Sequence, residues 1–155
     1  MEPWKTALQR GFVGGAASSI LSTAALAASG KREADSAFAP TNAVSHWIYG
    51  DAAYDEDGPS LRHTVPGYLI HHGSAVFWSV LFERLCGHLL DRKEPATTLG
   101  LAGAASAVAC FVDYQLTPKR FQPGYEQHLS KPSLAGVYAA FGIGLGLGAM
   151  LCRRT

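Results

Sequence analysis

The stretch from Thr64 to Leu90 constrains this chain most, because it is apolar enough for a membrane helix yet carries ionisable groups. It reads TVPGYLIHHGSAVFWSVLFERLCGHLL and contains His71 beside His72 and Glu83 beside Arg84. About 20 mostly apolar residues cross the hydrocarbon core of a bilayer, and ionisable groups inside such a span are costly to hold there. The stretch therefore predicts a membrane helix that turns its polar groups toward other helices.

Three more apolar blocks accompany this stretch, so we expect an all-α, polytopic membrane bundle of four transmembrane helices in a single domain over residues 1–155. The expected spans cover about 11–30, 66–90, 96–116 and 133–152, with polar loops over 31–65 and 117–132. A net charge of +1 gives no reason to expect a nucleic-acid partner. The three cysteines are expected to be reduced and packed as small hydrophobes, since they show no metal-type spacing.

The first apolar block, Gly11 to Gly30, has two interpretations. Ala25-Leu26-Ala27 behind a short basic lead is typical of a signal-peptide cleavage site. The apolar part is longer than a usual signal-peptide core and is broken by glycines, which favours a retained helix.

Small residues recur at spacings that allow helices to approach closely. A four-residue spacing places small side chains on one face of a helix, where a second backbone can come near. We expect the helix-packing residues to be Gly11, Gly15, Gly142, Gly144, Gly146 and Gly148. This pattern favours a small accessory or assembly subunit that packs against copies of itself or a larger membrane complex.

The first polar loop contains a short amphipathic pattern. Val44, Trp47 and Ile48 fall on one side of a helix that Thr41 can cap. We expect this helix to lie in the membrane interface, with Trp47 and Tyr49 as anchors.

A second functional hypothesis is a conduit or sensor for protons or a metal ion. Tyr68, His72 and Glu83 share one stripe of the second span, and His71 lies on the neighbouring stripe. Asp113 ends the third span on the same side of the membrane as the histidines, so these groups could relay protons, and His72 and Asp113 could hold a divalent metal. Glu83 would stand at the opposite end of such a path.

Structural interpretations of the same residues stay open beside this hypothesis. Paired histidines near a helix end commonly bond to backbone, and Glu83-Arg84 is also what is expected where a helix meets lipid headgroups. Asp113 could pair with an arginine of the following loop.

No nucleophile motif, phosphate loop or cofactor fingerprint is present, so an enzyme is not the favoured class and no cofactor is expected unless a divalent metal binds. Only the second expected span offers histidines within its apolar length, which argues against haem.

The segments NAVSHWIYGDAA and DYQLTPKRFQPG, with a glycine-rich first span and a histidine-bearing second span, resemble small uncharacterised bacterial inner-membrane proteins with four helices. This resemblance implies a multi-pass protein of the inner membrane in contact with the lipid bilayer, and no activity. Four spans place both termini on one side, and the acidic excess of residues 31–63 favours the cytoplasm for them.

Overall fold

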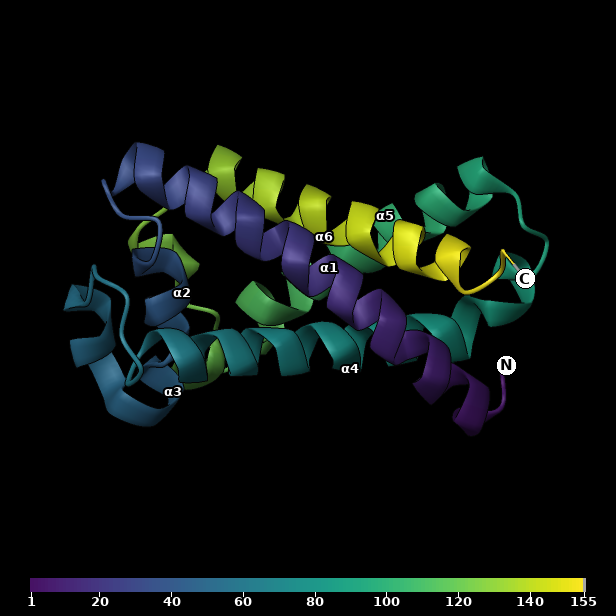
Figure 1. The fold of residues 1–155 in the computed structure, drawn as a ribbon, viewed down its shortest axis with the longest axis horizontal. Helices are drawn as coiled ribbons and strands as arrows, with labels where there is room; N and C mark the ends of the chain where they lie inside the picture. Colours follow the sequence, from purple (N-terminus) through teal and green to yellow (C-terminus); the bar gives the residue numbers. More distant parts are fainter. Residues whose placement is uncertain (155) are drawn as a thin grey trace. The chain divides into compact units, whose positions relative to one another are not determined.

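The structure is a computed structural model that describes residues 1–154, and these residues form helices and no strands. Figure 1 shows the helices along the chain. The long helices are α1 (Trp4–Glu33), α4 (Thr64–Leu90), α5 (Pro95–Phe111) and α6 (Lys131–Leu151). The short ones are α2 (Ala39–Val44), α3 (His46–Tyr49), the 3-10 helices η1 (Gly50–Asp55), η3 (Lys119–Phe121) and η4 (Tyr125–Gln127), and the π-helix η2 (Val112–Leu116). The all-α fold class is therefore confirmed.

The predicted number of membrane spans is wrong. Among the described residues, three helical segments are long and apolar enough to cross a membrane, namely Trp4–Glu33, Pro95–Leu116 and Lys131–Leu151. The helix α4 is long but is not one of them, because its histidines and its Glu83-Arg84 pair interrupt the apolar sequence. Three spans support a multi-pass membrane protein, but they remove the argument that an even number of spans brings both termini to one side.

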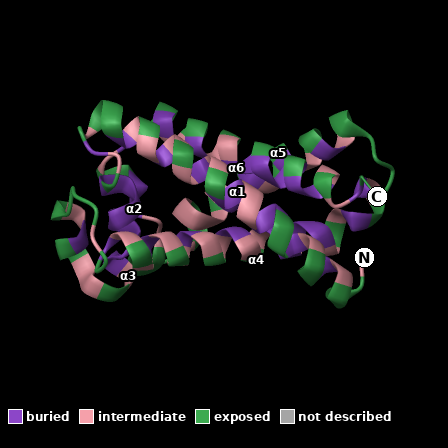
Figure 2. Cartoon of the chain, in the orientation of Figure 1, coloured by how far each residue is buried: buried purple, intermediate pink, exposed green. Residues whose placement is uncertain are grey.

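The chain divides into two compact units, each built from pieces of the same long helices. Unit 1 comprises Met1–Ser22, His72–Ala109 and Tyr138–Thr155, and unit 2 comprises Thr23–His71 and Cys110–Val137. Figure 2 shows buried positions alternating with exposed ones along α4 and α6, which is the pattern of helices that pack on one side.

Unit 1 has a core of small and aromatic side chains. Phe82, Phe141 and Leu145 pack in it with several alanines of α4, α5 and α6. Alanines add little apolar area, so the helices must approach closely for their backbones and short side chains to touch.

Glycines provide this close approach in unit 1. A Cβ built on Gly11 would lie 2.5 Å from Val80 Cγ2 of α4, and one on Gly15 would lie 2.6 Å from the Cα of Val76. A Cβ on Gly144 would meet the backbone of Ser18, and one on Gly148 would meet Gly14. On the other side of α6, a Cβ on Gly142 would lie 3.1 Å from Ser106 Cβ, and one on Gly146 would lie 2.8 Å from Leu99 Cδ2 of α5. All six glycines that the sequence singles out thus face a neighbouring helix of their own chain.

The buried serines of α1 satisfy their hydroxyls within the helix. Ser18 Oγ donates to the carbonyl of Gly14 at 2.9 Å, and Ser22 Oγ donates to that of Ser18 at 2.7 Å. Such back-bonding satisfies these two hydroxyls inside the helix.

In unit 2 the α2–α3 segment buries polar side chains as well as the apolar Val44. Asn42, Ser45 and His46 are buried, whereas Ile48 is exposed. Asn42 Nδ2 donates to the carbonyls of Glu56 and Gly58, both at 2.8 Å, and so fixes the acidic loop to α2. The polar side is buried because loop carbonyls satisfy it.

Trp47 and Tyr49, the predicted interfacial anchors, both make contacts inside unit 2. The indole of Trp47 donates to the carbonyl of Gln122 at 3.1 Å, and the ring of Tyr49 lies 4.9 Å from that of His63. An interfacial position for this segment stays a prediction.

Replacing Gly144 by leucine is expected to destabilise the protein, because the new side chain would meet the α1 backbone at Ser18. Overpacking of this kind costs about 1–3 kcal/mol. The matched control is Gly103→Leu on α5, where a Cβ meets nothing within 4 Å. Thermal unfolding in detergent should show a lower midpoint for Gly144→Leu alone, and equal midpoints for both variants would contradict the packing.

Candidate functional site

A buried histidine–tyrosine pair lies at the centre of unit 2. The Nδ1 atom of His71, on α4, lies 2.6 Å from the hydroxyl of Tyr125, on η4. Both residues are buried, with 8% and 5% of their surfaces exposed. A contact this short between an imidazole and a phenol, shielded from water, is a strong hydrogen bond.

Two carboxylates act on this pair. Burial raises the pKa of Tyr125 above its ordinary value, and the charges of Asp113 and Glu126 raise it further. Tyr125 therefore keeps its proton at neutral pH. His71 is the other titratable group of this pair.

Asp113 is carried by an irregular stretch of backbone. The α-helical part of α5 ends at Phe111, and residues Val112–Leu116 form the π-helix η2. A π-helical turn shifts the following side chains relative to an α-helix and is common at functional sites. Tyr114, in the same turn, interacts electrostatically with Glu126 and Tyr125 as well as with Asp113.

The loop that carries Tyr125 is fixed to α2 and α3. Gly124 has a φ of +88°, and a Cβ there would lie 3.2 Å from His46 Nδ1 and 3.3 Å from the carbonyl of Ala43. Only glycine adopts this positive φ and leaves room for these neighbours without strain. Arg120 donates to the carbonyls of His46 and Trp47 at 3.4 and 3.1 Å.

Of the residues predicted for an ion or proton site, His71 and Asp113 belong to unit 2, as does the half-buried Tyr68. His72 belongs to unit 1, where its Nδ1 lies 3.0 Å from Ser19 Oγ. Residues 1–154 contain no group of three or more His, Cys, Asp or Glu side chains that could hold a metal ion. A metal on His72 and Asp113 stays a prediction.

Glu83 forms a buried ion pair with Arg153. Both carboxylate oxygens accept from the guanidinium, at 2.9 and 2.8 Å, and the two side chains are only 2% and 4% exposed. Arg153 Nε also donates to Asp91 at 2.8 Å, and Arg10 joins Asp91 at 2.9 Å. This network favours a structural role for Glu83, which ties the end of the chain to α4.

Sequence reasoning missed Tyr125, Glu126 and Arg153 as site residues. The Pro123-Gly124 turn followed by an aromatic and an acidic residue was the available signal for the first two. Nothing local distinguishes Arg153 from the adjacent Arg154, since only the fold buries one and exposes the other.

A second polar cluster of unit 2 also escaped sequence reasoning. Ser45 Oγ lies 2.8 Å from His63 Nδ1, and His63 Nε2 lies 3.8 Å from Glu56. The order of groups is that of a hydrolytic triad, but Ser45 is fully buried and His63 only 4% exposed. A substrate has no access to this serine, so the cluster serves to hold the acidic loop.

Comparison with protein-family models, with curated proteins and with solved structures finds no match to this chain.

Breaking the buried ion pair is expected to be costly. Arg153→Met leaves the Glu83 carboxylate buried without a partner, a change that costs about 3–5 kcal/mol. Arg154→Met is the control, since Arg154 is exposed. Chemical unfolding in detergent should separate the two variants, and equal stability would show that the pair contributes nothing.

The network also predicts acid sensitivity. Burial raises the pKa of Asp91, but the hydrogen bonds and charges of Arg153 and Arg10 outweigh it and hold the pKa below its ordinary value of 3.8. A carboxylate with a lowered pKa stabilises the fold above its ordinary pKa and loses that contribution as the pH falls. The free energy of unfolding, measured between neutral pH and about pH 3, should therefore fall more steeply below about pH 4 in the wild type than in Asp91→Asn. Identical profiles would contradict the ion pairs.

Proposed function

We propose that this chain is a small multi-pass membrane protein that senses protons through His71 and Tyr125 beside Asp113. The 2.6 Å contact between His71 Nδ1 and the Tyr125 hydroxyl carries the proposal. Histidine is the side chain that changes charge between about pH 5 and pH 8, and a nearby carboxylate favours its charged form.

The surroundings of the pair support a coupling of its charge to the loop. Tyr125 belongs to the hydrophobic core of unit 2, where it packs with Leu26, Val44, Leu129 and Val137. Its loop is bound to Trp47 of α3 through Gln122 and Arg120. A charge that appears on His71 changes the hydrogen bond to Tyr125 and is felt in this core and this loop.

A sensor is better supported than a conduit. A path across the membrane needs a second proton-accepting group at the far end, which was the role predicted for Glu83. Both oxygens of Glu83 are held by Arg153. A carboxylate in a buried bidentate pair is a poor proton acceptor, so protonation at His71 would act locally.

The test is a histidine titration by NMR on protein in lipid nanodiscs, followed from about pH 5 to about pH 8. Asp113→Asn removes a negative charge that favours the imidazolium, so the titration midpoint of His71 should fall by about one pH unit. Tyr125→Phe should also shift this midpoint. The ring signals of His88, which is exposed on α4, check that the samples were prepared at the same pH.

A titration midpoint of His71 that is the same in the wild type and in both variants would overturn the proposal. Liposomes loaded with a pH-sensitive dye distinguish the sensor from the conduit. A sensor predicts no faster proton entry than in protein-free liposomes, whereas entry that His71→Gln abolishes would establish a conduit.

A second candidate function is that of an accessory subunit in a homo-oligomer or larger membrane complex. The observation that favours it is an open small-residue face on α5. A Cβ on Gly100 or Gly103 would meet nothing within 4 Å, and Ala104, Ala107 and Val108 are exposed beside them. Gly144 and Gly148 contact α1, so assembly would use α5 in their place. Gly100→Leu should then abolish association without loss of stability.

A further inference from the structure

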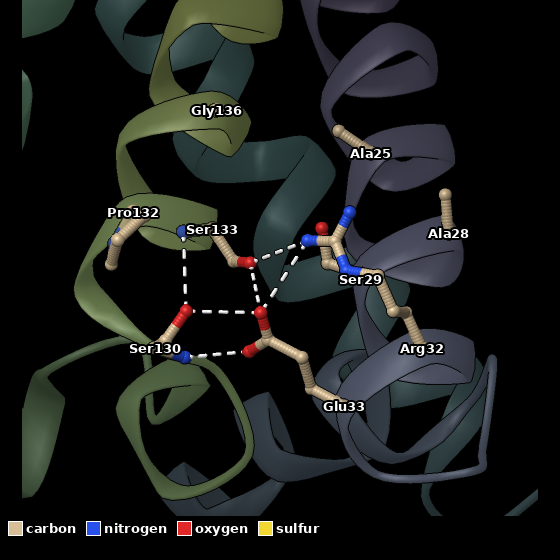
Figure 3. A pocket seen from close by; sticks show the side chains of 9 residues that line it. All are labelled: Ala25, Ala28, Ser29, Arg32, Glu33, Ser130, Pro132, Ser133 and Gly136. Atoms are coloured by element: carbon tan, nitrogen blue, oxygen red, sulfur yellow. Dashed lines mark hydrogen bonds and ion pairs between the residues drawn. The ribbon is translucent and has the colours of Figure 1, made fainter.

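An open pocket of about 340 Å³ lies in unit 2 beside the last turns of α1 and the first turns of α6 (Figure 3). Ala25, Ala28 and Gly136 form its apolar wall, and Arg32, Glu33 and Ser133 stand at its polar end. The apolar wall and the charged end belong to the same two helices, so the pocket is amphipathic along its length.

The carboxylate of Glu33 is already engaged by α6. It accepts from the backbone N–H of Ser130 at 2.7 Å, from Ser130 Oγ at 2.9 Å and from Ser133 Oγ. These bonds satisfy the donors at the beginning of α6, as an N-terminal cap does. Glu33 is therefore a fixed part of the pocket and not an acceptor for a ligand.

The guanidinium of Arg32 still has donors available. Its Nη2 donates to Ser133 Oγ at 2.8 Å and lies 3.4 Å from Glu33. Figure 3 shows the other two nitrogens without an interaction, and no residue in the described part of the chain accepts from them. The side chain is 69% exposed. Each free N–H group of the Arg32 guanidinium can donate singly to an oxygen of a phosphate.

The pocket stands where a lipid headgroup would be. Both α1 and α6 are apolar enough to cross a membrane, and the pocket lies where α1 ends and α6 begins. Arginines at such ends reach the headgroup layer. From there the wall of Ala25, Ala28 and Gly136 runs back along the helices, and a Cβ on Gly136 would meet nothing within 4 Å.

We propose that this pocket binds a membrane phospholipid, with the phosphate on Arg32 and the upper part of an acyl chain along the wall at Gly136. The apolar wall favours a lipid over a soluble phosphate, since a soluble anion would gain nothing from it. The nearby Glu33 carboxylate disfavours a dianion, whereas the phosphodiester of a lipid carries a single negative charge.

The test uses the full chain in detergent, titrated with phosphatidylglycerol and followed by native mass spectrometry. Arg32→Gln removes the phosphate donors, and Gly136→Leu fills the wall without a clash. Each should weaken lipid binding about tenfold. Arg154→Gln controls for loss of an exposed arginine, and Gly73→Leu on α4 controls for an added leucine at an open glycine.

Thermal unfolding checks that the Arg32→Gln and Gly136→Leu proteins are folded. If one of them does not fold, lipid binding by the other variant serves as the test. Binding that matches the wild type in the folded variants would overturn the proposal. Glycerol phosphate added as a competitor separates the two sources of phosphate. It should displace the lipid poorly, and displacement at equal concentration would assign the pocket to a soluble phosphate ester and overturn the lipid assignment.

Discussion

Contact between helix backbones at small residues is the interaction on which unit 1 depends. In an apolar environment helices gain little from burying leucine, and their association rests on close packing and internal hydrogen bonds. Gly11 and Gly15 bring α1 onto α4, and Gly144 and Gly148 bring α6 onto α1. The serines beside these contacts bond to their own helix and add no unpaired polar atom.

Three buried polar side chains follow from the same constraint, since each finds a partner inside the chain. Glu83 has Arg153, Asn42 has the carbonyls of the acidic loop, and His71 has Tyr125. The first two are fully paired and hold segments together. The third joins an imidazole to a loop, which makes it the pair on which the proposed proton sensing rests.

The sequence was informative wherever a regular period controls the outcome. Helix positions and the small-residue spacing follow from local sequence pattern. Most ends of the four long helices could therefore be predicted to within a few residues. A short helix was also expected in the first polar loop, where α2 and α3 lie. The burial of Asn42 was not expected, because the carbonyls that accept from it belong to a loop whose path is not local. Arg153 and Tyr125 escaped for the same reason, since their partners lie far away in sequence. The prediction that α4 spans the membrane was wrong because of its hydropathy. The polar groups that give α4 its contacts also make the helix less apolar.

The internal packing of unit 1 is tested most directly by solid-state NMR on protein with ¹³C-labelled glycine, diluted with unlabelled protein in lipid bilayers. The structure places Gly148 against Gly14 within one chain. A cross-peak between their Cα atoms that persists on dilution is the predicted result. A cross-peak that disappears on dilution, or none in the undiluted sample, would contradict the account.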